Sequence, residues 1–372
     1  MNHEQYLSMR SQAEAVGMTL HPNIERRCVD GVYGMYASGP IGKNEVFASL
    51  PQSAVMPLDI DFDYPFELTN QLKTIHVIAR RMSGLAEPWF YTDSFYPLSF
   101  FKEHNVYYCT NEELETLKQG SPLLYKFAIA EKNSISRMVD GLLELDPQLD
   151  TDTLARVALN YRYRAWGEFG FLPVLDMFNH SDKKGRLLST KKPNFSFLAG
   201  KDYESGDQIW ISYGAKDMYL HAINYGYFDP DADHAIDLGF RVSSVASTPE
   251  QIASMKQLSK VLKVKVYPES NGAFEYQLEQ GQGMIRLGEV DKSVITYLHH
   301  EVSPRLPKNS NKSELGRASR ARLLGYVNAL TEQNLVHQIT ESVFPEKLRY
   351  MYHMLVKERT ILLQTASSLT KS

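Results

Sequence analysis

The spacing of hydrophobic residues changes several times along the chain, and each change predicts a different kind of element. Residues 5–16 have a helical pattern, and Gly17 follows as a C-terminal stop. From residue 23 to 57 short extended runs are broken by glycines, and residues 46–50 predict a strand. The chain is therefore expected to begin with a helix followed by compact β structure with tight turns.

A long stretch from residue 60 to about 160 is mainly helical in pattern. Four apolar residues recur three and four positions apart, which places them on one face of a helix: Leu72, Ile75, Ala79 and Met82. Residues 143–159 continue the helical pattern, with a break at Pro147. Strands and turns return between residues 165 and 243, with strands expected at 171–175, 195–198 and 208–213.

The last third of the chain is predicted to be mainly helical with one hairpin. A helix is expected near 248–262, and Asn271-Gly272 between two alternating runs predicts a hairpin. Three further helices are expected near 289–300, 312–335 and 342–367.

These patterns predict an α+β protein in which a helical insert interrupts a β unit. We divide the chain into an N-terminal helix with the first half of the β unit (1–59), the insert (60–160), the second half (161–243) and the mainly helical C-terminal domain (244–372).

Composition and charge narrow the possible functions. Hydrophobic residues make up 43% and charged residues 23%, as in an ordinary soluble globular protein. The net charge of −4 does not indicate nucleic acid or an anionic membrane as a partner. Cys28 and Cys109 are too few for a disulfide framework or a Cys-rich zinc cluster. No apolar run reaches the roughly 18 residues that span a bilayer, and the polar N-terminus predicts no secretion signal. We expect an intracellular monomer, cytoplasmic or nuclear; secretion directed by the C-terminal tail stays open.

Two segments carry polar residues at the ends of expected strands, where functional side chains are often placed. Pro173–Asp182 (PVLDMFNHSD) presents Asp176, Asn179 and His180. Gly206–Gly214 (GDQIWISYG) ends on a Tyr-Gly step. Each segment also has a purely structural interpretation, as a capped turn or as a core tyrosine.

A third segment, Asp30–Val46, has two glycines three positions apart in a strand–turn–strand pattern. Glycines there let the backbone approach a ligand closely, although a simple hairpin has the same pattern. The segment lacks the helix that a dinucleotide-binding fingerprint requires.

In this order the segments resemble the SET-domain protein methyltransferases, in particular the split-SET group that includes Rubisco large-subunit methyltransferase and the actin-histidine methyltransferase. The matching runs are Asp30-Gly31-Val32-Tyr33-Gly34, Arg164-Ala165-Trp166, Asp176 to Ser181, Gly206 to Gly214 and Tyr225-Gly226-Tyr227. The resemblance implies a knotted, β-rich SET domain interrupted by a helical insert. It also implies an all-α C-terminal domain that binds the substrate.

The resemblance further implies a site for S-adenosyl-L-methionine, with Arg164 holding the cofactor carboxylate. The implied cofactor-binding residues are Asp30, Gly31, Val32, Arg164, Asp176, Asn179, His180, Tyr225 and Tyr227. Tyr213 corresponds to the catalytic tyrosine, and Trp166 and Ser212 to the substrate pocket. No metal is implied. Trp166 stands where the family has Phe, and Asp217-Met218 stands where it often has Ser-Asn.

The function implied by this resemblance is S-adenosylmethionine-dependent protein-lysine N-methylation. The partner would be a protein substrate, with neither nucleic acid nor a membrane required. Two alternatives stay open: a protein-histidine N-methyltransferase of the same fold, and a catalytically weak SET-fold binding module.

Overall fold

The computed structural model describes residues 3–29, 32–51, 61–166, 170–181, 194–213, 218–226, 228, 234–238, 264–268, 274–278, 284–286, 289–302, 311–344 and 346–371. The chain divides into two compact units. The first comprises Met1–Tyr108 and Glu131–Ala215, and the second comprises Cys109–Ala130 and Lys216–Ser372. This division assigns residues 109–130 of the predicted insert to the same unit as the C-terminal part of the chain.

The first unit opens with helix α1 (His3–Ala15), which ends before Gly17 at a φ of 97°, as the sequence predicts. Its antiparallel strands form a three-stranded sheet in the order β1-β4-β6 and a two-stranded hairpin, β2-β3. The bounds are Thr19–Leu20 (β1), Ile24–Val29 (β2), Val32–Ala37 (β3), Val46–Pro51 (β4) and Asn194–Leu198 (β6). Because β6 pairs with β4, the parts before and after the insert share one sheet, and the strands predicted at 46–50 and 195–198 are confirmed.

The unit also contains two short parallel strands, β5 (Asn179–His180) and β7 (Trp210–Ile211). The segment before β7 also pairs with the first half, because the Ile209 amide donates to the Met35 carbonyl at 2.8 Å. The predicted strand at 208–213 is therefore present in shortened form. The knot expected from the resemblance stays a prediction.

The insert is helical, as predicted. Its helices are α2 (Asn70–Met82), η2 (Phe90–Ser94), α3 (Leu98–His104), η3 (Val106–Tyr108), α4 (Asn111–Gly120), α5 (Pro122–Leu145) and α6 (Thr151–Arg164). Thr69 and Asp150 cap α2 and α6 by accepting backbone N–H bonds. Helices α2 and α6 pack together, so the apolar face predicted for α2 lies in the core of the first unit, where Ile75 and Ala79 are fully buried.

The strand predicted at residues 171–175 is wrong. This run forms turns that lead into the short helix η5 (Leu175–Met177), and Val174 has a φ of 66°. The Asp176 amide donates to the Leu172 carbonyl and closes the turn. The run is apolar because it is buried, and a short apolar run does not reveal whether its backbone is extended.

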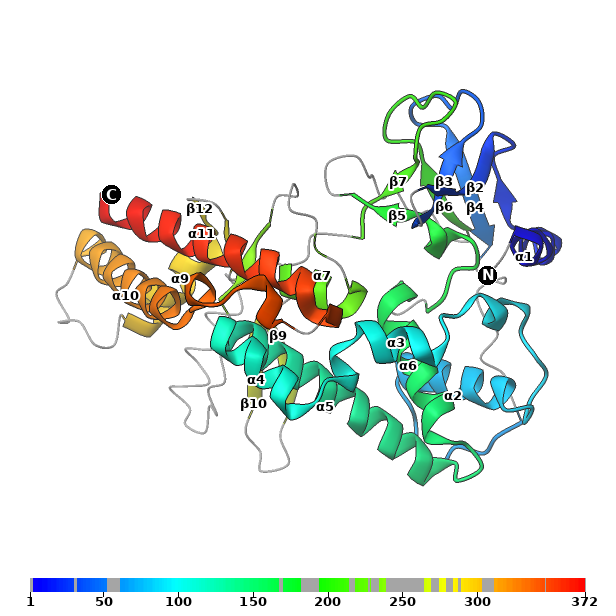
Figure 1. Ribbon diagram of the computed structural model, residues 1–372, viewed down its shortest axis with the longest axis horizontal. Helices are drawn as coiled ribbons and strands as arrows, with labels where there is room; N and C mark the ends of the chain where they lie inside the picture. The colour runs from blue at the N-terminus through cyan, green and yellow to red at the C-terminus, as the bar shows by residue number, and fades with distance from the viewer. Residues whose placement is uncertain are drawn as a thin grey trace. The chain divides into compact units, whose positions relative to one another are not determined.

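The second unit combines helices with small sheets. Its helices are α7 (Met218–Tyr225), α9 (Lys292–Val302), α10 (Lys312–Gln333), η7 (Val336–Gln338), η8 (Glu341–Val343), η9 (Glu346–Leu348) and α11 (Arg349–Lys371). Its strands are β8 (Ile236–Asp237), β9 (Val264–Pro268), β10 (Phe274–Leu278), β11 (Met284–Arg286) and β12 (Glu289–Val290). Helices α10 and α11 lie side by side (Figure 1).

These strands correct the expectation of an all-α C-terminal domain. Strands β9 and β10 pair in antiparallel register and confirm the hairpin predicted around Asn271-Gly272, and β8, β11 and β12 form a second sheet. The alternating side chains of these segments favour extended backbone over helix. The helix predicted at 248–262 lies outside the described residues. No described helix combines the length and the apolar character of a membrane span.

Candidate functional site

The polar contacts of Asn179 join segments that are far apart in the sequence. The Asn179 side-chain amide donates to the Tyr33 carbonyl at 2.9 Å, across a separation of 146 residues. It therefore connects β5 with β3, which begins at the predicted cofactor residue Val32. Two of the segments singled out in the sequence thus meet in the first unit.

Gly34 is the position where these segments come closest. A Cβ atom added there would lie 2.4 Å from the Gln208 amide nitrogen and 3.0 Å from that of Asn179. Real Cβ atoms do not approach other atoms at the shorter of these distances, so a side chain at this position would displace its neighbours. The glycine pattern of the sequence therefore serves the packing of β3 against Asn179 and the segment before β7.

His180 and Tyr213 form the second contact of the site. In the parallel pairing of β5 with β7, His180 lies opposite Ile211, two residues before Tyr213. The Tyr213 amide donates to His180 Nδ1 at 3.0 Å. The two rings are stacked, with centroids 4.9 Å apart and planes inclined by 29°. The histidine therefore fixes both the backbone and the ring of the tyrosine.

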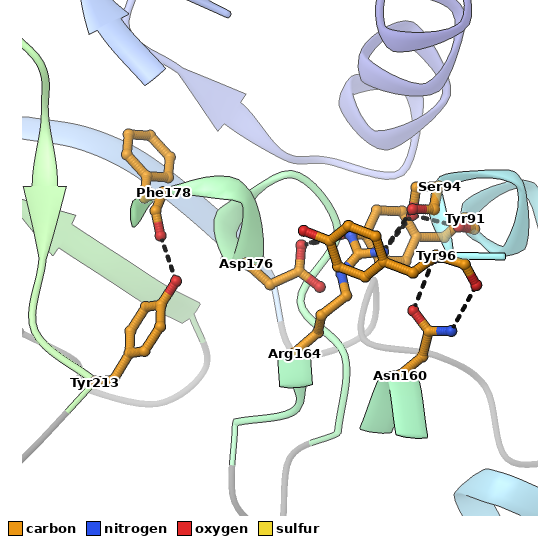
Figure 2. Close-up of polar contacts among 8 residues, drawn as sticks. All are labelled: Tyr91, Ser94, Tyr96, Asn160, Arg164, Asp176, Phe178 and Tyr213. Atoms are coloured by element: carbon orange, nitrogen blue, oxygen red, sulfur yellow. Dashed lines mark hydrogen bonds and ion pairs between the residues drawn. The ribbon is translucent and has the colours of Figure 1, made fainter. Parts of the chain in front are cut away.

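The Tyr213 hydroxyl has a defined direction (Figure 2). It donates to the main-chain carbonyl of Phe178 at 2.9 Å. The ring is only partly buried, and the indole of Trp166 lies edge-on to it with centroids 6.4 Å apart. The proton is used in the bond to Phe178, and a phenolic oxygen can accept hydrogen bonds as well as donate one.

Arg164 and Asp176 form a buried ion pair rather than two separate polar positions. Arg164 Nη2 lies 3.1 Å from Asp176 Oδ1, and the side chains are 7% and 1% exposed. Arg164 Nη1 donates to the carbonyl oxygen of Ser94 at 2.7 Å and to its hydroxyl at 3.0 Å. The hydroxyl of Tyr91 donates to Asp176 Oδ1 and accepts from Arg164 Nη2. Figure 2 shows this arrangement, which we call the Arg164 cluster (Tyr91, Ser94, Arg164 and Asp176).

Burial and pairing oppose one another in the electrostatics of the Arg164 cluster. Burial alone would lower the pKa of Arg164, but Asp176 and Tyr91 outweigh it and raise that pKa, so the guanidinium stays charged. Burial raises the pKa of the Asp176 carboxyl, and the charge of Arg164 acts against this increase. Burial also raises the pKa of Tyr91 well above its usual value, so its hydroxyl keeps its proton.

The residues suit the expected cofactor in two respects. Asp176 Oδ2 is buried and has no hydrogen-bond partner among the described residues, so it offers an acceptor for an ammonium group such as the amino-acid end of S-adenosylmethionine. Val32 is 61% exposed and offers an apolar surface beside the Tyr33–Asn179 contact. The polar and apolar parts of the cofactor thus have complementary groups in the first unit.

The predicted direct bond from Arg164 to the cofactor carboxylate stays a prediction. In this structure both terminal nitrogens of Arg164 already donate to groups of the chain itself. The sequence reasoning missed the partners Tyr91 and Ser94, which lie in the insert. A buried tyrosine usually finds a hydrogen-bond partner. The aromatic run WFYTDSFY, which is expected to be buried, is therefore the sequence signal that could have identified Tyr91.

The remaining predicted residues are distributed as follows. Ser212 lies between Ile211 and Tyr213 at the end of β7. Tyr225 ends α7 in the second unit, where its ring lies edge-on to that of His221. Asp30, Gly31 and Tyr227 lie outside the described residues. Among the residues that are described, no group of three or more His, Cys, Asp or Glu side chains is placed to hold a metal ion.

Of three comparisons with known proteins, the one with solved structures indicates a fold. No family model matches the sequence, and no curated protein does. The SET domain of LSMT bound to methyllysine and AdoHcy matches with a TM-score of 0.66 and 16% identity, over 99% of this chain and 91% of that one. Rubisco LSMT bound to sinefungin and monomethyllysine matches with a TM-score of 0.64 and 16% identity, over 100% and 92%. Rubisco LSMT bound to AdoMet matches with a TM-score of 0.64 and 14% identity, over 99% and 92%. The chain therefore has the fold of these SET-domain structures.

Proposed function

We propose that this protein is an S-adenosylmethionine-dependent protein-lysine N-methyltransferase. The observation that carries the proposal is the fixed hydroxyl of Tyr213, which donates to the Phe178 carbonyl directly before the Asn179–His180 strand. The fold is that of LSMT structures containing methylated lysine, AdoHcy or AdoMet. A pure binding module has no need of a tyrosine oriented in this way, so the geometry favours an enzyme.

The cofactor, when bound, supplies a methyl group activated on a sulfonium. We propose that its amino-acid end is held at the Arg164 cluster, where Asp176 Oδ2 accepts from the ammonium. Asn179 and His180 would hold the remainder of the cofactor, together with the segment around Val32. We further propose that the cofactor is contacted by the other residues that the resemblance implies: Asp30, Gly31, Tyr225 and Tyr227.

Tyr213 is proposed to orient the target nitrogen. A lysine amine has a pKa of about 10.4 and is almost entirely protonated at neutral pH, so the site must favour the neutral amine by removing water from it. Trp166 and the stacked rings of His180 and Tyr213 provide an apolar surround for this step. The Tyr213 oxygen, whose own proton is donated to Phe178, can accept a hydrogen bond from an amine N–H and align its lone pair. Alignment is the largest contribution available to such a transfer.

The partner is proposed to be a protein substrate bound through the C-terminal helices. We propose that neither nucleic acid nor a membrane takes part and that the protein acts as a monomer.

The proposal is tested by incubating the purified chain with a cell lysate and isotopically labelled S-adenosylmethionine. Mass spectrometry then identifies the modified residue. Label on lysine is the expected result; label on histidine would replace the lysine assignment with the alternative of the same fold. Tyr213→Phe keeps the ring and deletes the hydroxyl, and should lower the single-turnover rate by roughly two to four powers of ten.

Tyr203→Phe is the matched control, because Tyr203 is a buried tyrosine of the same unit that pairs with Ile41 instead of the site. Its transfer rate should stay within a few-fold of the wild type. A Tyr213→Phe protein that transfers methyl groups at the wild-type rate would remove the catalytic assignment and leave the binding module as the better interpretation.

A further inference from the structure

Tyr91 is fully buried and lies in η2 of the helical insert, and the sequence analysis assigned it no role in the site. Its hydroxyl donates to Asp176 Oδ1 across 85 residues of sequence and accepts from Arg164 across 73 residues. The ring also lies under the Arg164 guanidinium, with the guanidinium carbon 4.9 Å from the ring centroid. The insert thus contributes a polar group to the interior of the proposed site.

Asp176 links this hydroxyl to the catalytic tyrosine through a short turn. Asp176 lies in η5, and Phe178 is the residue that directly follows η5. The Phe178 carbonyl is the acceptor for the Tyr213 hydroxyl. Backbone bonds from the Asp176 and Met177 amides to Leu172 and Val174 hold the turn in one conformation. Figure 2 shows the two ends of this link, the contact of Tyr91 with Asp176 and the bond from Tyr213 to Phe178.

We propose that Tyr91 is a positioning residue for methyl transfer: by holding Asp176 it fixes the turn whose following carbonyl orients the Tyr213 hydroxyl. The proposal rests on the proposed function, because it assigns Tyr91 a part in the same reaction.

Phenylalanine could fill the space of the Tyr91 ring but could not hold Asp176. Without the hydroxyl, Asp176 would lose a donor and Arg164 would lose an acceptor inside the protein, where an unsatisfied polar group is costly. The carboxylate and its turn would then shift towards other donors. A displacement of about 1 Å at a reacting group can reduce a rate by about a hundredfold, so a smaller shift of the Phe178 carbonyl is sufficient for a measurable effect.

The test compares Tyr91→Phe with Tyr163→Phe. Tyr163 is the matched control because it is a buried tyrosine on α6 beside Arg164 in sequence, but its hydroxyl faces Asn105 and its ring packs on Phe101. Single-turnover transfer at saturating cofactor should fall about tenfold in Tyr91→Phe and stay within about twofold in Tyr163→Phe. In a Tyr213→Phe background, adding Tyr91→Phe should change the rate by less than about twofold, because residues acting through one another are not additive.

A Tyr91→Phe rate equal to that of the control would overturn the inference, and so would a full tenfold loss in the Tyr213→Phe background. The wild-type protein in the same assay tests the function separately, since an inactive wild type refutes the methyltransferase proposal alone.

A readout independent of activity is fluorine NMR of protein labelled with 3-fluorotyrosine. The Tyr213 resonance is the one absent from Tyr213→Phe, and it should shift in Tyr91→Phe but not in Tyr163→Phe. An unmoved resonance would contradict the positioning role whatever the enzyme does. Should Tyr91→Phe fail to fold, Ser94→Ala loosens the same Arg164 cluster, and it should move the resonance in the same direction by a smaller amount.

Discussion

Glu358 makes the stability of the second unit depend on pH. It lies in the middle of α11, is 1% exposed and accepts a hydrogen bond from the Ser121 hydroxyl at 2.9 Å. Burial raises the pKa of its carboxyl from 4.5 to about 7, although hydrogen bonds from Ser121, Asn334 and Tyr219 act in the opposite direction. The carboxyl is therefore protonated in the folded protein at pH values where it is ionised in the unfolded chain.

The sign of the effect follows from proton binding. Between pH 4.5 and about 7 the folded state binds more protons at Glu358 than the unfolded state, so the free energy of unfolding falls as pH rises through this interval. Above pH 7 the carboxyl is ionised in both states and the loss is complete. The interval from 4.5 to about 7 corresponds to a loss of about 3 kcal/mol in the free energy of unfolding.

The change Glu358→Gln removes the ionisation and keeps the shape of the side chain. We expect the variant to resemble the wild type at pH 5 and to exceed it by up to about 3 kcal/mol at pH 8, measured by urea denaturation across this range. Glu332→Gln is the control, because Glu332 is exposed on α10, and its effect should be small at every pH. A constant difference between Glu358→Gln and the wild type from pH 5 to pH 8 would refute the reasoning.

Two further predictions concern the site. Arg164→Ala leaves Asp176 buried without its cation and should lower the free energy of unfolding by about 3 to 5 kcal/mol; calorimetry should also show weaker cofactor binding, by about 1.5 to 3 kcal/mol. Arg162→Ala on the same helix is the control, because its side chain is 26% exposed, and a loss of stability equal to that of Arg164→Ala would contradict the burial argument. Gly34→Ala should change stability little, because the atom nearest the new Cβ, Gln208 Nε2 at 2.4 Å, is the end of a flexible side chain that can turn away. It should reduce cofactor affinity, because the Asn179 side-chain nitrogen at 3.0 Å must also give way; unchanged calorimetry would show that Asn179 adapts freely.

The helices and most of the strands could be predicted because their signals are local. The spacing of Leu72, Ile75, Ala79 and Met82 specifies one buried face, and α2 forms there. Alternation around Asn271-Gly272 likewise specifies the β9–β10 pairing. The run at 171–175 failed because complete burial erases the periodicity on which such predictions depend.

The candidate site was predictable only in part, for a different physical reason. Motif spacing identified Asn179, His180 and Tyr213, which the structure brings together through β5 and β7. It could not show that Arg164 and Asp176 pair with each other, because a charged residue looks the same in the sequence whether its partner is a ligand or another side chain. Only the folded structure shows how many hydrogen-bonding positions of Arg164 and Asp176 are left for a ligand.

The Arg164 cluster shows why that difference matters for the insert. A buried charge is tolerated where it is paired and hydrogen-bonded, and here the pairing of Arg164 with Asp176 is completed by Tyr91 and Ser94 from η2. Two residues of η2 therefore help to satisfy a buried ion pair whose acid, Asp176, lies shortly before β5. We expect any change in η2 that moves the Tyr91 hydroxyl to displace Asp176. Because Asp176 lies in the η5 turn, the displacement should also change the orientation of the Tyr213 hydroxyl.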